Sequence, residues 1–394
     1  MSWINYVLFR ILTFPLQFLP YKLLSKLGKG LGLLVYYAYP KYRKRALSNL
    51  ALATDLNLTP EEIVSLAKQS IQSLTTTFLE YPRLYQENNI ASIASCENPE
   101  IAASLIKEGK GVIFFCGHQA NLELLFLEGT SRMPGVAIGR PIANQPLYEW
   151  VLRLRQKFGG TIIPPRDAYR ASVKALKAGK FLGIVGDQGM PDSGFLCPFL
   201  GRDAWTSPLP ALLSKRTGAP IIVATIRREQ GKYIIHYSDP IEPQEDVEAQ
   251  MKQVLKLFEA SIKARPHEWL WVHNKWKQQL PGRLKKGFRQ DSVAFIFGND
   301  PEALQWLPKL RELYPTEQVT AFVPQGLPAS SLCEIKPYQQ LSDLLTPDYR
   351  FKLIVDFTRT PRLADHFKQL SALQTFQFAH PKEMIQHACP SILS

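Results

Sequence analysis

The stretch Gly111-Val-Ile-Phe-Phe-Cys-Gly-His-Gln-Ala-Asn-Leu-Glu123 does most to decide the fold. Residues 111–116 are a short, apolar run of large side chains, which predicts a buried β-strand. Gly117 and His118 follow at the end of this strand, and a helix is expected over residues 121–129. A strand, a polar turn and a helix in this order form the repeating unit of sheets with parallel strands.

The same alternation continues along the chain. Helices are expected over residues 41–90, before this strand, and a long amphipathic helix over residues 247–265. Between them the pattern predicts further strands at 136–138, 161–163, 181–185, 221–226 and 233–237, and helices at 147–158, 169–178 and 208–217. We therefore expect an α/β fold with a mostly parallel sheet flanked by helices.

The sequence pattern changes near residue 290, and this change predicts a second folded unit. Residues 281–289 are basic and contain glycine, as linkers often do, and a new alternation follows. It predicts strands at 292–297, 318–323 and 351–355 and a helix at 301–314. The predicted organisation is a membrane-anchoring helical segment at residues 1–40, a central domain at 41–285 and a small C-terminal α/β domain of unknown role at 291–394.

The charge of the chain is unevenly placed. The net charge is +13 over 394 residues, and residues 1–50 carry eight Lys and Arg with no Asp or Glu. Nucleic-acid-binding arms rarely mix basic residues with so dense an apolar background, so we expect an anionic membrane rather than a nucleic acid as the partner. Near an anionic leaflet each of these cations contributes roughly 1 kcal/mol of attraction.

Residues 3–21 are mostly apolar and lack the small-residue cleavage site of a removable signal peptide. As one helix they would be roughly 28 Å long, close to the hydrocarbon thickness of a bilayer. The charge of Arg10 and the prolines Pro15 and Pro20 argue against one uninterrupted membrane-spanning helix. Two forms of anchoring stay open, a tilted span and a kinked helix pair lying in the headgroups, and a buried hairpin is the alternative to both.

The five cysteines are widely spaced and form no CxxC pair. This spacing argues against a disulfide framework and against a zinc site, and it favours a reducing compartment. Cys116 lies two residues before His118, but a thiol inside an apolar strand is more often inert than nucleophilic.

His118 and Glu123 are the candidate catalytic pair. A histidine at a strand end, with a carboxylate five residues later at a helix start, is suited to removing a proton from a hydroxyl while the carboxylate orients the ring. The N–H groups at the start of the following helix would stabilise an oxyanion.

Polar clusters follow the next three strands, so all are expected to meet at one edge of the sheet. Arginines among them suit phosphate or carboxylate recognition, and Asp187 suits orienting an arginine or closing a turn. The candidate substrate-binding residues are Arg140, Asn144, Arg166, Asp187 and Gln188.

These features together resemble the bacterial lipid A biosynthesis acyltransferases, late acyltransferases within the lysophospholipid acyltransferase superfamily. The resemblance covers roughly residues 1–280, in the order and spacing of its pieces. They include Arg45-Ala-Leu-Ser-Asn49-Leu, Gly117-His118 through Glu123, Arg140-Pro-Ile-Ala-Asn144, Pro165-Arg166, Gly186-Asp187-Gln188, Pro198-Phe199-Leu-Gly201, Thr217-Gly-Ala-Pro220, Arg265-Pro-His-Glu-Trp269 and His273-Asn-Lys-Trp276.

The resemblance implies a fold of the glycerol-phosphate acyltransferase type and a catalytic His-x4-acid dyad, here His118 and Glu123. It implies acyl transfer from an acyl carrier protein, or from acyl-CoA, to a hydroxyl of a lipid A precursor in lipopolysaccharide biosynthesis. It also implies the cytoplasmic face of the inner membrane as the location, a glycolipid acceptor, and no metal or redox cofactor. The alternatives are acylation of a lysophospholipid or phosphoglycolipid, and a catalytically degenerate membrane-bound scaffold.

Overall fold

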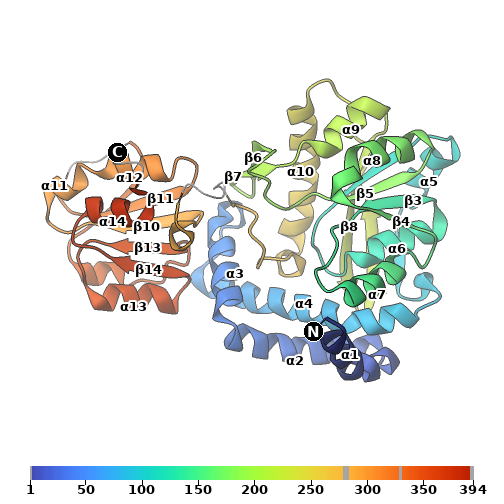
Figure 1. Ribbon diagram of the computed structural model, residues 1–394, viewed down its shortest axis with the longest axis horizontal. Coiled ribbons are helices and arrows are strands. Elements are labelled where there is room, and N and C mark those ends of the chain that lie inside the picture. The colour runs from blue at the N-terminus through green and yellow to red at the C-terminus, as the bar shows by residue number, and fades with distance from the viewer. Residues whose placement is uncertain (1, 278–283, 328–330, 391–394) are drawn as a thin grey trace.

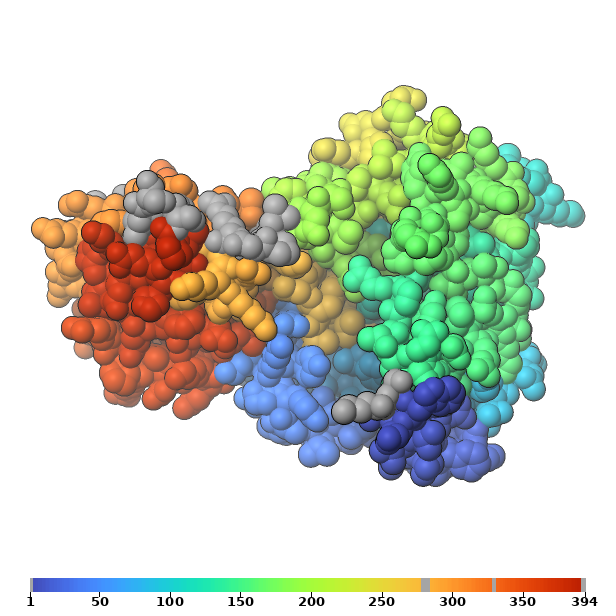
Figure 2. Space-filling view, in the orientation of Figure 1, coloured from blue at the N-terminus to red at the C-terminus, as the bar shows by residue number. Residues whose placement is uncertain are grey.

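The computed structural model describes residues 2–277, 284–327 and 331–390. It contains two α/β units, one built on a seven-stranded sheet and the other on a five-stranded sheet (Figure 1). Figure 2 shows these units as two lobes, with the C-terminal residues in one and the N-terminal residues at the lower edge of the other.

The larger sheet has the strand order β1-β9-β8-β2-β5-β3-β4. Every neighbouring pair is parallel except β8 and β9, which confirms the predicted mostly parallel sheet. Two strands that the sequence did not predict, β6 and β7, form a separate antiparallel hairpin. The strands are β1 (Ala94–Cys96), β2 (Val112–Cys116), β3 (Gly135–Ile138), β4 (Thr161–Ile163), β5 (Phe181–Val185), β6 (Phe195–Phe199), β7 (Arg202–Thr206), β8 (Ile221–Glu229) and β9 (Lys232–Tyr237).

Strand β2 lies in the middle of this sheet and is buried on both faces. Ile113 and Phe115 pack on one side, whereas Val112 and Phe114 pack on the other. Burial on both faces explains why the strand reads as an unbroken apolar run. Helices α8 (Ala168–Lys177), α9 (Leu209–Thr217) and α10 (Val247–Ala264) cover the first face, and α5 (Glu100–Lys107), α6 (Glu123–Arg132) and α7 (Gln145–Arg155) cover the second.

The apolar segment at residues 3–21 does not form one continuous helix. Helix α1 (Ser2–Thr13) gives way to a short 3-10 turn, Phe14–Phe18, because Pro15 has no N–H to continue the ladder. Helices α2 (Tyr21–Ala38), α3 (Pro40–Leu52) and α4 (Pro60–Gln86) follow. Within the residues described above, no helix combines the length and apolarity that a membrane span needs.

Helices α2 and α4 pack closely through two glycines. A Cβ on Gly28 would lie 2.4 Å from the Thr76 hydroxyl, and one on Gly32 would lie 2.5 Å from the Gln72 Cα. Only glycine allows this approach, so the pairing fixes which face of α2 turns inward. The opposite face is left to solvent, including Leu23, Leu27, Leu31 and Leu34.

The smaller sheet has the order β12-β11-β10-β13-β14, and all its neighbouring strands are parallel. The predicted helix at 301–314 is wrong as one element, because it is divided into α11 (Pro301–Leu304) and α12 (Leu307–Leu313). Pro308 has no N–H to donate to the Leu304 carbonyl four residues before it, so one continuous helix cannot form across this point. The other elements are β10 (Ser292–Ile296), β11 (Gln318–Pro324), β12 (Glu334–Tyr338), β13 (Leu353–Asp356), α13 (Pro361–Gln369), β14 (Gln374–Gln377) and α14 (Pro381–Ala388).

A buried lysine joins the two units. The Nζ of Lys352 lies 2.7 Å from an Asp291 carboxylate oxygen and donates to the Asn49 side chain, also at 2.7 Å. Burial lowers the pKa of Lys352 to about 8. Ser48, next to Asn49 on α3, donates to the Arg350 carbonyl at 2.7 Å. The amino ends of β10 and β13 therefore dock on α3, and their carboxyl ends point away from the larger unit.

Candidate active site

His118 lies where β2 ends, beside the end of β5. Because Cys116 pairs with Val185 in the parallel ladder, the residues that follow the two strands come together. The His118 Nδ1 lies 2.7 Å from one Asp187 carboxylate oxygen, and its backbone N–H donates to the other at 2.8 Å. A Cβ on Gly117 would lie 2.8 Å from this carboxylate and 2.1 Å from the Phe258 ring, so the approach requires a glycine.

Asp187 is fully buried and accepts a further hydrogen bond from the Trp269 indole N–H at 2.8 Å. Burial raises the pKa of this carboxyl, but the His118 ring and its hydrogen bonds outweigh burial and hold the pKa well below its usual range. Burial likewise lowers the pKa of His118, and Asp187 outweighs it, so the pKa of the ring is raised. With Nδ1 bonded to Asp187, the basic lone pair of the neutral ring is on Nε2.

The structure does not place the Glu123 carboxylate against the His118 ring, as the predicted pair would require; the carboxylate bonded to Nδ1 is that of Asp187. Glu123 begins α6 and forms a bidentate ion pair with Arg155, with N–O distances of 2.8 Å and 2.5 Å, and it accepts from the Tyr81 hydroxyl at 2.8 Å. Burial raises the pKa of Glu123, but Arg155 outweighs burial and lowers it. Ala120, with a φ of 40°, turns the chain between His118 and Glu123, and the two side chains leave the turn toward different partners.

A late segment of the chain supports the His118 turn. The Ala120 N–H donates to the Glu268 carbonyl at 2.8 Å, and the Leu270 N–H donates to the His118 carbonyl at 2.9 Å. The His273 ring contacts the Leu270 carbonyl and lies 3.4 Å from the Asp187 carbonyl. Residues 268–273 thus help to fix the positions of both His118 and Asp187 through these contacts.

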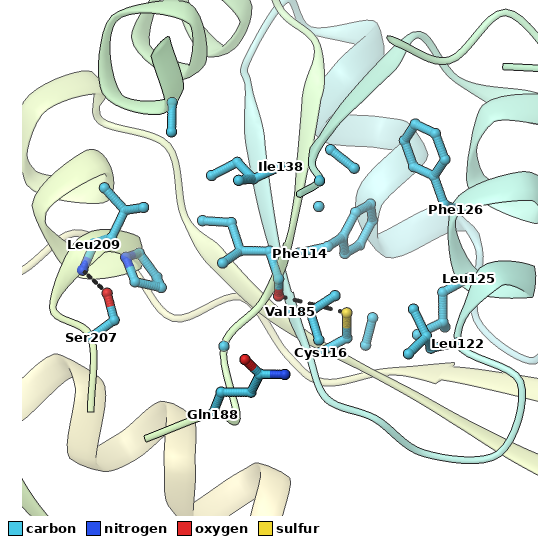
Figure 3. Close-up of a pocket in the computed structure, with 18 of the residues that line it drawn as sticks. Phe114, Cys116, Leu122, Leu125, Phe126, Ile138, Val185, Gln188, Ser207 and Leu209 are labelled. Atoms are coloured by element: carbon cyan, nitrogen blue, oxygen red, sulfur yellow. Dashed lines mark hydrogen bonds between the residues drawn. The ribbon is translucent and has the colours of Figure 1, made fainter. Parts of the chain in front are cut away.

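A cavity of about 870 Å³ opens beside His118. It lies over the carboxyl ends of β2, β3 and β5 and reaches both faces of the sheet. Figure 3 shows Phe126 and Leu125 on one side, Leu209 and Ser207 on the other, and Phe114 between them. Its lining is mostly aliphatic and aromatic, with a few polar groups, which include His118, Glu123, Arg140, Arg155 and Gln188.

A family comparison identifies the kind of enzyme to which this site belongs. The model of the bacterial lipid A biosynthesis acyltransferases matches residues 1–278, well over half of the chain. The chain belongs to this family. It is accordingly an acyltransferase that transfers groups other than amino-acyl groups, as its curated relatives are named.

Three relatives show how far the similarity extends. The lipid A biosynthesis lauroyltransferase of Escherichia coli K12 is 23% identical over 288 residues, covering 71% of this chain and 93% of the relative. The palmitoleoyltransferase of the same organism is 24% identical over 271 residues, covering 67% and 88%. The acyltransferase of Haemophilus influenzae is 22% identical over 269 residues, covering 65% and 82%.

The acyltransferase site brings together only some of the residues predicted to bind substrate. Arg140 and Gln188 are exposed residues that line the cavity. Asn144 instead caps α7, where its side chain accepts from the Leu147 N–H at 3.1 Å. The Arg166 side chain is 90% exposed, lies 3.7 Å from Asp167 and does not contribute to the lining.

Sequence reasoning missed Arg155, Tyr81 and Trp269 as parts of the site. Arg155 lies in the last turn of α7, where a basic residue ordinarily complements the helix dipole, so nothing local marks it. Burial raises the pKa of the Cys116 thiol, as expected for an inert cysteine in a strand. In the described part of the chain, no cluster of three or more His, Cys, Asp or Glu could hold a metal ion.

Proposed function

We propose that this acyltransferase moves a fatty acyl chain from the thioester of an acyl carrier protein to a hydroxyl of a lipid A precursor. The observation that carries the proposal is His118, bonded to the buried Asp187, in the wall of a mostly apolar cavity. Such a cavity suits an acyl chain, and the pair suits removal of a proton from the acceptor hydroxyl.

In the proposed reaction, Nε2 of His118 takes the proton of the acceptor hydroxyl, and the oxygen attacks the thioester carbon. A C–O bond forms, the C–S bond breaks, and the departing thiolate takes the proton from the imidazolium. Asp187 stabilises that imidazolium through the 2.7 Å contact with Nδ1. Base catalysis of this kind contributes about 10²–10⁴ in rate.

The start of α6 is the proposed site of oxyanion stabilisation. The Leu122 side chain, at the N-cap position, does not cap this helix, and Leu122 and the first helical residue, Glu123, line the cavity. The start of a helix carries partial positive charge. In this turn the Leu124 and Leu125 N–H groups already donate to the Asn121 and Leu122 carbonyls at 3.1 Å, so the helix dipole is the proposed source of stabilisation. Arg140, exposed at the cavity edge, would hold a phosphate of the acceptor or of the donor's phosphopantetheine arm.

The acceptor is tested by direct competition. Purified enzyme with a dodecanoyl carrier protein should add one chain to a lipid A precursor that has a free 3-hydroxyl on an attached acyl chain. A lysophospholipid in the same mixture should remain unacylated, and mass spectrometry of the lipids reads out both products. Acylation of the lysophospholipid in place of the precursor would support the alternative acceptor class.

We also propose that α1 and α2 lie in the headgroup region at the cytoplasmic face of the inner membrane. Large apolar side chains of α1 and its following turn are solvent-exposed, among them Trp3, Ile11, Leu12 and Phe18 at 63–77%. Exposed apolar surface on this scale is typical of a membrane or protein interface. The eight cations in residues 1–50 add attraction to anionic lipid.

Leu12→Glu is expected to weaken binding to anionic phospholipid vesicles about tenfold or more, because burying a leucine stabilises binding by roughly 1.5–3 kcal/mol. Vesicle co-sedimentation measures the bound fraction. Leu257→Glu is the matched control, since Leu257 is also an exposed leucine on a helix, α10. Equal binding by the two variants would count against membrane contact through α1.

A further inference from the structure

Helix α8 carries a stripe of positive charge beside the cavity. Arg170, Lys174 and Lys177 are exposed and follow one another at intervals of four and three residues, which places them on one face of the helix. The helix contains no Asp or Glu. Among the described residues, no ion pair or side-chain hydrogen bond neutralises these three cations.

The stripe begins at the cavity opening. Pro165, in the turn before α8, and Ala168, the first residue of α8, line the cavity, and so does Leu212 on the neighbouring helix α9. Exposed residues of the lining mark where the cavity meets solvent: Met190 is 37% exposed and Leu212 is 41% exposed. A macromolecule seated on α8 and α9 would therefore cover the opening.

The position of α8 in the fold indicates whether its cations can meet a membrane or a soluble partner. Figure 1 shows α8 and α9 at the end of the larger unit opposite α1 and α2. When the exposed apolar residues of α1 rest on a membrane, the helix that carries the basic stripe lies at the far end of the unit from it (Figure 1). Anionic lipid is then out of reach of the stripe, because charges separated by more than about 10 Å are screened at ordinary salt.

We propose that the α8–α9 surface, defined as Arg170, Lys174 and Lys177 with exposed Tyr169, Met190 and Leu212, docks the acidic carrier protein that delivers the acyl thioester. This inference rests on the proposed function. Its grounds are charge complementarity with an acidic partner and continuity with the opening through which the thioester arm must pass. The exposed apolar side chains supply the centre of the interface, and the cations supply its rim.

The test compares two donors, dodecanoyl carrier protein and dodecanoyl-CoA, whose acyl chain and thioester chemistry are the same. Arg170→Glu/Lys174→Glu should raise KM for the carrier-borne donor about tenfold and leave kcat near the wild-type value. The rates with dodecanoyl-CoA should be unchanged, which also shows that the variant is folded. Added salt should raise the wild-type KM for the carrier and have little further effect on the variant.

The matched control is Arg362→Glu/Lys382→Glu, which reverses two exposed charges on helices α13 and α14 of the smaller unit. It should leave KM for both donors unchanged. A wild-type KM for the carrier in Arg170→Glu/Lys174→Glu would overturn the docking surface, and so would equal losses with both donors. Absence of transfer from either donor by the wild-type enzyme would instead overturn the proposed function.

Discussion

Replacing His118 by alanine should lower kcat/KM for acyl transfer by about 10³-fold, since general-base catalysis contributes roughly 10²–10⁴. The variant loses the Nε2 lone pair that takes the hydroxyl proton, while the apolar cavity that holds the acyl chain remains. Steady-state transfer from carrier thioester to the lipid A precursor, with membrane-reconstituted protein, measures the effect. Binding of the donor should change much less than kcat.

His236→Ala is the control for this loss. His236 lies on β9, its side chain is 52% exposed, and its contact is with Glu97 rather than with the site. The variant should therefore transfer acyl chains at the wild-type rate. Transfer at that rate by His118→Ala would remove the basis for assigning the base.

Asp187→Asn should lower kcat/KM by about 10²–10⁴-fold, because a neutral amide neither fixes the tautomer of His118 nor stabilises its imidazolium. The acid limb of the pH profile of kcat/KM should also move to lower pH. Asp187 raises the pKa of His118, so loss of its charge lowers that pKa, and the variant should keep its remaining activity to lower pH than the wild type.

Glu123→Gln provides the comparison. It also removes a carboxylate from the cavity wall, but it leaves the contact between His118 and Asp187 in place. Its main effect should be on folding, because Arg155 and Tyr81 lose their shared partner in a largely buried position. A rate loss accompanied by a large shift of the acid limb in Glu123→Gln, and none in Asp187→Asn, would reverse the roles assigned to the two carboxylates.

The parts of the fold that local pattern determines could be predicted from the sequence. Residues 111–116 and 181–185 are continuous apolar runs because β2 and β5 are buried on both faces of the sheet. Strand β14 was missed because Gln374–Gln377 begins and ends with an exposed glutamine, as an edge strand can. The β6–β7 hairpin was missed because Pro198 interrupts its apolar pattern.

Only part of the site could be predicted, because the pairing of its residues depends on the order of strands in the sheet. His118 and Asp187 could both be proposed because each follows a strand, and ligand sites in α/β sheets lie beyond such strand ends. Their pairing depends on β2 and β5 being neighbours, which is set by the order of strands in the sheet. Sequence spacing alone favours Glu123 as the partner of His118, because residues five apart are often close in space. In the structure, the turn between them directs the two side chains toward different partners.

The measurement that tests the account most directly is an NMR titration of the His118 ring in histidine-labelled protein. The chain has seven histidines, and the spectrum of His118→Ala assigns the relevant signal. The account predicts a pKa above the ordinary histidine value in the wild type, a clear fall in Asp187→Asn and a smaller change in Glu123→Gln. A pKa that falls in Glu123→Gln and stays unchanged in Asp187→Asn would contradict it.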